Sequence, residues 1–286
     1  ICYKINMKNK LYNALFSELN PYFYIKVKDG RSETGNKESY YGKIPRDDRC
    51  TFDISNNKVL VHMGESGKIK AANFYRDCYP ADDIPGVWMH KDFSSVAVSY
   101  EIFINGQKQE IDKNTEYTMD LVDNIFPRTL LYFGNVKVSI ILYAPISENG
   151  DTRSNAFVYG MCIENTGPDP VNGEIRIIGE TDAEDDFLKN EISILQGSGR
   201  ETTEFSLPAA EHIWIPSVIY APGRYEEAEK IRNNSSYWFE QTHNYFRNML
   251  GRLVVEGHPV EGALFERAVM QCFHAIAMNA SGEVTG

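Results

Sequence analysis

Residues 128–179 decide the fold class of this chain. They read RTLLYFGNVKVSIILYAPI at 128–146, NAFVYGMCIENTG at 155–167 and NGEIRIIG at 172–179. Residues rich in Val, Ile, Tyr and Phe alternate with polar ones, and Gly, Asn, Asp and Pro mark the breaks, which is the pattern of antiparallel strands packed on one face. Gly134 and Asn135 both tolerate positive φ and fit a two-residue hairpin turn. The stretch therefore predicts a β-sandwich.

The same alternation extends in both directions from this stretch. Asn105-Gly106 joins two alternating runs and predicts a type I′ hairpin, and Asn56-Asn57 predicts a turn inside a meander. Counting all such runs gives on the order of a dozen strands, more than an immunoglobulin-type sandwich needs. We therefore expect a large antiparallel β-supersandwich over residues 1–221. The further predicted strands cover residues 22–28, 50–55, 58–63, 68–75, 94–104, 107–111, 117–122, 191–196, 203–207 and 212–220.

After Ala221-Pro222-Gly223 the spacing of apolar residues changes from a period of two, typical of strands, to a period of about 3.6, typical of helices. Residues 222–258 predict a helical linker, which a polar patch at 233–236 divides in two. Residues 261–280 predict a helix that is apolar nearly all round, so we expect it to be buried on most sides. Residues 259–286 would then begin a helical domain. Its covering would lie further along a longer polypeptide or on another subunit. A shorter apolar spacing also predicts a helix within residues 6–19.

Charge and composition exclude several classes of function. The net charge is −11, and we find no Lys/Arg cluster, so nucleic acid and anionic membranes are not expected partners. The five cysteines are widely spaced and odd in number, as in a protein with free buried thiols in a reducing compartment, which predicts a cytoplasmic location. The 17 Tyr and 15 Phe suit either sugar stacking or an ordinary sandwich core.

A search for catalytic chemistry finds few candidates. The six histidines form no metal-binding pair, and there is no nucleophile elbow, phosphate loop or dinucleotide fingerprint. We therefore predict no catalytic residue, no metal and no cofactor. The aperiodic segment 76–92 carries the best ligand-binding candidates. Trp88 could stack on a sugar, or it could simply anchor the loop to the core. The other candidates in this segment, which could form hydrogen bonds with the hydroxyls of a sugar or with a phosphate, are Arg76, Asp77 and His90.

The order of these parts resembles the glucoamylase-like and disaccharide-phosphorylase-like six-hairpin glycosidases. Residues 57–79 resemble the opening of their supersandwich, 136–165 its central strands, 228–250 the linker helices, and 264–285 the first helix of their (α/α)6 barrel. The resemblance implies cleavage of glycosidic bonds by hydrolysis or phosphorolysis, with the catalytic carboxylates downstream of this chain. It implies an oligosaccharide or disaccharide as partner, inorganic phosphate if the enzyme is a phosphorylase, and a homodimer.

Two alternatives remain open at the level of sequence. One is a non-catalytic carbohydrate-binding or assembly module, which would bind sugar without chemistry in any longer chain. The other is a mutarotase-like active sandwich, which would need a histidine, such as His62 or His212, and a carboxylate to converge on one sheet face.

Overall fold

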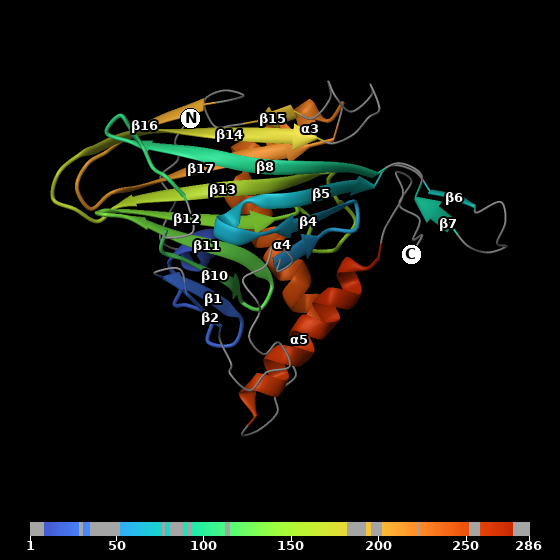
Figure 1. Ribbon diagram of the computed structural model, residues 1–286. Helices are drawn as coiled ribbons and strands as arrows, with labels where there is room; N and C mark the ends of the chain where they lie inside the picture. Colours follow the sequence, from blue (N-terminus) through green and yellow to red (C-terminus); the bar gives the residue numbers. More distant parts are fainter. Residues whose placement is uncertain are drawn as a thin grey trace.

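The computed structural model describes residues 9–28, 31–34, 52–75, 78–80, 88–90, 93–111, 115–181, 193–195, 202–221, 223–251 and 258–276. Within these residues the chain is mainly β, with two large antiparallel sheets packed face to face and with the long C-terminal helices, in orange and red, below them (Figure 1). The β-sandwich expected from residues 128–179 is confirmed. A barrel continuation is not shown.

The first sheet has eight strands, and the strands of residues 126–133, 136–143 and 156–165 lie at its centre. Residue-by-residue antiparallel pairing runs from β11 through β12 and β13 to β17. In sheet order the strands are β15 (Ser193–Leu195), β17 (His212–Tyr220), β13 (Ala156–Asn165), β12 (Val136–Tyr143), β11 (Phe126–Phe133), β10 (Tyr117–Val122), β1 (Tyr24–Lys28) and β2 (Arg31–Thr34).

The second sheet has seven strands and carries the candidate site described below. The expected meander is present as three adjacent strands, and the expected hairpin turns at Asn105 and Gly106 with φ of 49° and 78°, as a type I′ turn requires. In sheet order the strands are β16 (Thr202–Leu207), β14 (Val171–Thr181), β8 (Phe93–Ile104), β5 (Ile69–Tyr75), β4 (Val59–Met63) and β3 (Phe52–Ser55), with β9 (Gln107–Lys108) paired to β8. A 3-10 turn, η1 (Glu65–Gly67), joins β4 to β5.

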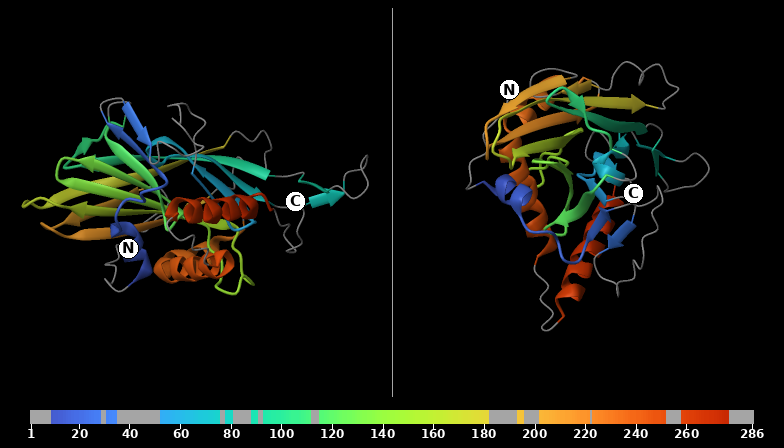
Figure 2. Two further views of the ribbon diagram at one scale, coloured as in Figure 1. Left: turned by 90° about the horizontal axis from the view of Figure 1, so that it is seen from below. Right: turned by 60° about the vertical axis from the view of Figure 1, so that its left-hand side comes forward.

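Four helices cover the eight-stranded sheet and one end of the sandwich (Figure 2). They are α1 (Lys10–Phe16), α3 (Tyr225–Asn233), α4 (Ser235–Leu250) and α5 (Pro259–His274). The α4 helix buries Phe239 and Phe246 against Phe126 of the sheet, with ring centroids 4.8 and 6.1 Å from that ring. Each buried ring removes a large apolar area from water, so this contact fixes the helical layer on the sandwich. None of the described helices is long and apolar enough to cross a membrane.

Within the described residues, the last helix is buried on one face, and the covering expected on its other sides would come from outside them. One face of α5 is buried, and it includes the polar residues Arg267 and His274 as well as Met270. The opposite face is open, with Phe265 44% exposed and Cys272 exposed. The sequence did not reveal that this helix is amphipathic, because two of its polar residues point inward. The expectation of buried thiols holds for Cys162 but is wrong for Cys272.

A second correction concerns residues 76–92, which were expected to lack regular structure. Two short strands, β6 (Cys78–Pro80) and β7 (Trp88–His90), pair antiparallel within this segment. They project beyond the end of the sandwich at which β8 begins (Figure 1). Three-residue strands leave no detectable alternation in a sequence, so periodicity could not reveal them.

Gly160 of β13 gives the first testable prediction. An added Cβ would lie 1.9 Å from the indole ring of Trp214, which is buried and donates from Nε1 to Ser235 Oγ at 3.0 Å. The ring cannot yield without losing that bond and its packing. We expect Gly160→Ala to lower the free energy of unfolding by about 2–3 kcal/mol in urea denaturation.

Gly134 provides the matched control, because it has positive φ but open space around it. Gly134→Ala should lower the free energy of unfolding only by the cost of backbone strain, about 1–2 kcal/mol. Equal losses in the two variants would contradict the packing argument for Gly160.

Candidate functional site

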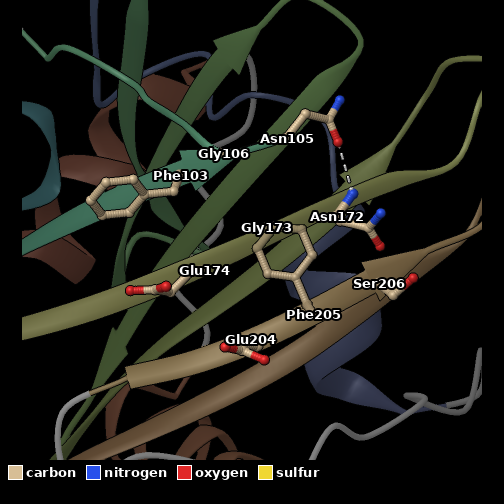
Figure 3. A pocket seen from close by; sticks show the side chains of 9 residues that line it. All are labelled: Phe103, Asn105, Gly106, Asn172, Gly173, Glu174, Glu204, Phe205 and Ser206. Carbon is tan, nitrogen blue, oxygen red and sulfur yellow. Dashed lines mark hydrogen bonds between the residues drawn. The ribbon is translucent and has the colours of Figure 1, made fainter.

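The described residues form a groove on the outer face of the seven-stranded sheet. It has a volume of about 920 Å³ and lies where the β8–β9 turn, β14 and β16 come together (Figure 3). Its lining combines aromatic rings, carboxylates, amides and exposed backbone. The lining residues are Phe103, Asn105, Gly106, Asn172, Gly173, Glu174, Glu204, Phe205 and Ser206.

Strand register explains why these side chains meet. Glu174 of β14 lies directly opposite Phe103 of β8 on one side and opposite Glu204 of β16 on the other. Residues opposite each other in a sheet point to the same face, so the ring and both carboxylates project together. Their neighbours Ile175 and Val171 point the other way and are buried in the core.

Gly173 forms the floor of the groove. A Cβ at this position would lie 2.3 Å from the ring of Phe205 and 2.4 Å from the backbone oxygen of Phe103. Phe205 is itself buried and supports the floor from the core side. Only glycine permits this close approach of strands and ring, so the packing beneath the groove depends on Gly173.

Two hydrogen bonds between Asn105 and Asn172 hold the turn between β8 and β9 against β14. Asn105 donates from its backbone nitrogen to Asn172 O at 2.7 Å, and its side-chain Oδ1 accepts from Asn172 N at 3.0 Å. These two bonds hold the open end of the hairpin beside the groove, so that the amide side chains form its rim (Figure 3).

An alternating set of charges surrounds the ring of Phe103. The guanidinium of Arg176 lies 4.6 Å from the ring centroid and is bonded to the carboxylate of Glu174. Arg176 also lies 3.8 Å from Glu101, which accepts a hydrogen bond from Lys108 at 2.5 Å. That hydrogen bond lowers the pKa of Glu101 and raises the pKa of Lys108. The cations beside the groove are therefore already paired with carboxylates.

Such a surface suits a ligand that carries many hydroxyl groups on an apolar ring face. An aromatic ring can accept the C–H face of a pyranose, while carboxylates and amides exchange hydrogen bonds with its hydroxyls. The arrangement offers binding chemistry. Among the described residues, no group of three His, Cys, Asp or Glu side chains could hold a metal ion.

None of the residues predicted as ligand-binding is among the residues described as lining the groove. Arg76 and Asp77 fall outside the described residues, and so do the side chains of Trp88 and His90, whose backbone forms β7. The β7 strand precedes the beginning of β8, whereas the groove lies at the end of β8. These 12 residues of extended strand separate the two places by roughly 35–40 Å. The sequence prediction and the groove therefore concern different surfaces.

A second polar cluster lies where α5 covers the edge strand β3. His62 Nδ1 and Asp53 Oδ1 are 2.9 Å apart on the outer face of β3 and β4. A histidine and a carboxylate thus converge on one sheet face, as a mutarotase-like sandwich would need. His212, the other candidate, packs instead against the rings of Tyr12 and Phe16. The His62–Asp53 pair lies beside the buried His274 and Arg267.

Comparisons with known proteins give little further guidance. No family model and no curated protein sequence matches the chain. Among solved structures, the chain is similar to an inverting mannosidase of family GH92 from Bacteroides thetaiotaomicron, with 10% identity and a TM-score of 0.30. The match covers 80% of this chain and 37% of that one. A likeness this weak establishes neither a family nor an activity.

Proposed function

We propose that this chain is the β-sandwich and helical connector of a carbohydrate-active enzyme, and that it binds an oligosaccharide in the groove of the seven-stranded sheet. In this proposal the chain recognises carbohydrate, and the cleavage of the glycosidic bond, by hydrolysis or phosphorolysis, is carried out by residues outside it. The alternative is a carbohydrate-binding or assembly module with no associated chemistry.

The observation that carries the proposal is the composition of the groove. Phe103, Glu174 and Glu204 stand side by side on three neighbouring strands, and two asparagines form the rim. An aromatic ring flanked by hydrogen-bond acceptors is the combination that a sugar needs, since its apolar face and its hydroxyls must be satisfied together.

The architecture is consistent with a connector role. The helices α3, α4 and α5 follow the last strand. The α3 helix packs against β17 and β15, α4 lies below the eight-stranded sheet, and α5 lies against α4 and the edge strand β3 (Figure 1). The order of sandwich, linker helices and further helix is the order that the six-hairpin resemblance implied. A groove on the opposite side of the sandwich would remain accessible to a long sugar chain.

Titration calorimetry with maltose and cellobiose tests the proposal. We expect binding of at least one disaccharide, and Phe103→Ala should weaken it about tenfold, because the loss of ring contact corresponds to about 1–1.5 kcal/mol. We also expect no release of monosaccharide by the chain alone.

Tyr132→Ala is the matched control. Tyr132 is 46% exposed on the eight-stranded sheet, so its loss removes an accessible ring away from the groove. Binding should be unchanged in this variant. No heat with any oligosaccharide, or equal weakening in both variants, would overturn the assignment of the groove. Binding that is never accompanied by glycoside cleavage in a longer chain would favour the non-catalytic alternative.

A further inference from the structure

We propose that α5 is a separately opening element, which acid releases from the sandwich through protonation of His274 in its last turn. The proposal does not depend on carbohydrate binding and concerns the helix that follows the linker. It differs from a general loss of stability in acid, because the two large sheets stay folded when the helix opens.

The described residues bury α5 on one face only. On that face the ring of Phe273 lies 5.4 Å from the ring of Phe246 in α4. Near the middle of the helix, Glu266 accepts hydrogen bonds from Arg247 at 3.1 Å and from Asn124 at 2.8 Å. An element that is joined to a domain by one face can open without unfolding its sheets, because the contacts within the sheets remain intact.

The seven-stranded sheet holds the end of α5 through Asn57. This residue lies in the turn between β3 and β4, is 1% exposed and has a φ of 71°. Its side-chain nitrogen donates to Phe273 O at 2.9 Å and to Ile276 O at 3.0 Å. Carbonyls at the end of a helix have no donor within the helix itself. The closed position of α5 therefore depends on a latch that belongs to the sandwich.

His274 follows Phe273 in the same turn and supplies the sensitivity to acid. Its side chain is 4% exposed, and neither ring nitrogen has a hydrogen-bond partner among the residues that the structure describes. The charged or titratable groups near it there are Arg267 on α5, Asp53 on β3 and His62 on β4. Burial lowers the pKa of His274 to about 3, Arg267 and His62 act in the same direction, and Asp53 opposes them. A protonated imidazole at this place would be a buried cation without an acceptor, so the closed helix holds His274 neutral.

Opening exposes the imidazole to water, where it binds a proton below pH 6.5. The closed helix binds that proton only near pH 3, so a fall in pH below 6.5 favours the open state. Between pH 7.5 and 5.5 the equilibrium constant for opening should therefore rise about tenfold. Unfolding of the sheets has the same dependence on this proton but breaks many more contacts, so the helix opens first.

Hydrogen exchange at pH 7.5 and 5.5, in several low concentrations of urea and corrected for intrinsic exchange rates, tests the proposal. Amides of α5 should be less protected than those of β12 and β13 and should depend less on urea. Their protection should fall about tenfold at the lower pH. Protection and urea dependence equal to those of the sheets would show that α5 opens only on global unfolding and would overturn the proposal. Protection of α5 that does not change with pH would also overturn it.

Two variants and their controls separate the latch from the histidine. His274→Phe should abolish the pH dependence of α5 protection, whereas His258→Gln, at an exposed histidine, should retain it. Asn57→Gly removes both latch bonds and tolerates the positive φ, so it should lower α5 protection about tenfold at either pH. Asn105→Gly makes the same change at a turn residue with a φ of 49° beside the groove and should leave α5 unchanged. Equal effects of the two glycine variants on α5 would contradict the latch, and this comparison holds even if His274→Phe does not fold.

Discussion

Replacement of Arg128 by methionine is expected to lower the free energy of unfolding by about 3–5 kcal/mol. Arg128 and Asp120 form an ion pair whose side chains are 0% and 1% exposed. They lie opposite each other on β10 and β11, with Arg128 Nε and Nη2 donating to the carboxylate at 2.8 and 2.6 Å. Removing the arginine leaves a buried carboxylate without its cation, which is far more costly than losing a surface pair.

The loss should extend to the N-terminal helix. Arg128 Nη1 donates to Ala14 O at 2.8 Å and to Ser17 O at 3.1 Å, while Nη2 donates to Glu18 O at 3.2 Å. The Ala14 carbonyl also accepts from Ser17 Oγ at 3.1 Å, so the carbonyls of Ser17 and Glu18, just beyond the end of α1, depend more on Arg128. We therefore expect amide protection in α1 to fall more than in β13 when hydrogen exchange is measured on the variant.

The double variant Arg128→Met/Asp120→Asn should recover part of the loss, because the unpaired charge is then removed. Recovery should be incomplete, since the carbonyls after α1 still lack their donor. Lys28→Met is the control: the pair of Lys28 with Glu116 at 3.3 Å is well exposed, so its loss should cost less than about 1 kcal/mol. A loss below that value for Arg128→Met would contradict this account of the core.

The second large effect is acid destabilisation through His274. This side chain is 4% exposed, and neither ring nitrogen has a hydrogen-bond partner within the described structure. The pKa of His274 is lowered to about 3, chiefly by burial and next by the nearby charge of Arg267. Asp53 opposes this shift, and His62 adds to it. The native state therefore holds a neutral imidazole at any pH near neutrality.

The sign of the effect follows from linkage. In the unfolded chain the imidazole takes up a proton below pH 6.5, whereas in the folded chain it does so only near pH 3. Stability is therefore full above pH 6.5 and declines as pH falls toward 3, by about 1.4 kcal/mol per pH unit. Between pH 6.5 and 5, where few carboxylates titrate, the loss should reach roughly 2 kcal/mol.

His274→Phe should remove this slope while changing stability at pH 7 by less than about 1.5 kcal/mol, since it keeps an aromatic ring in an enclosed site. The measurement is urea denaturation at several pH values from 7.5 to 5. His258→Gln, at an exposed histidine before α5, should retain the wild-type slope. An unchanged slope in His274→Phe would show that this histidine is accessible to protons in the native state.

The sequence predicted local structure well where one period dominates. The strands at 117–122 and 212–220 were placed at their observed limits, and the Asn105-Gly106 turn was identified from its residues alone. It did less well where polar residues point inward. Arg128 and His274 gave no sign of burial, because the partner that permits burial lies far away in the chain or is absent from the described residues.

The groove could not be predicted because its residues come from three separated segments. Phe103, Glu174 and Glu204 meet only through the pairing of β8 with β14 and of β14 with β16, and register between distant strands is set by packing. The sequence search weighed Arg76, Asp77, Trp88 and His90 because aromatic and charged residues are adjacent there. A signal for the groove existed in Gly173, a glycine inside a strand, which often marks a close approach.

The most direct test of the central claim is a crystal structure of the 286-residue chain grown or soaked with cellobiose or maltose. The account predicts sugar density against Phe103, with hydroxyls within hydrogen-bonding distance of Glu174 or Glu204. Sugar bound at another surface, such as that around β7, with the groove empty, would contradict it.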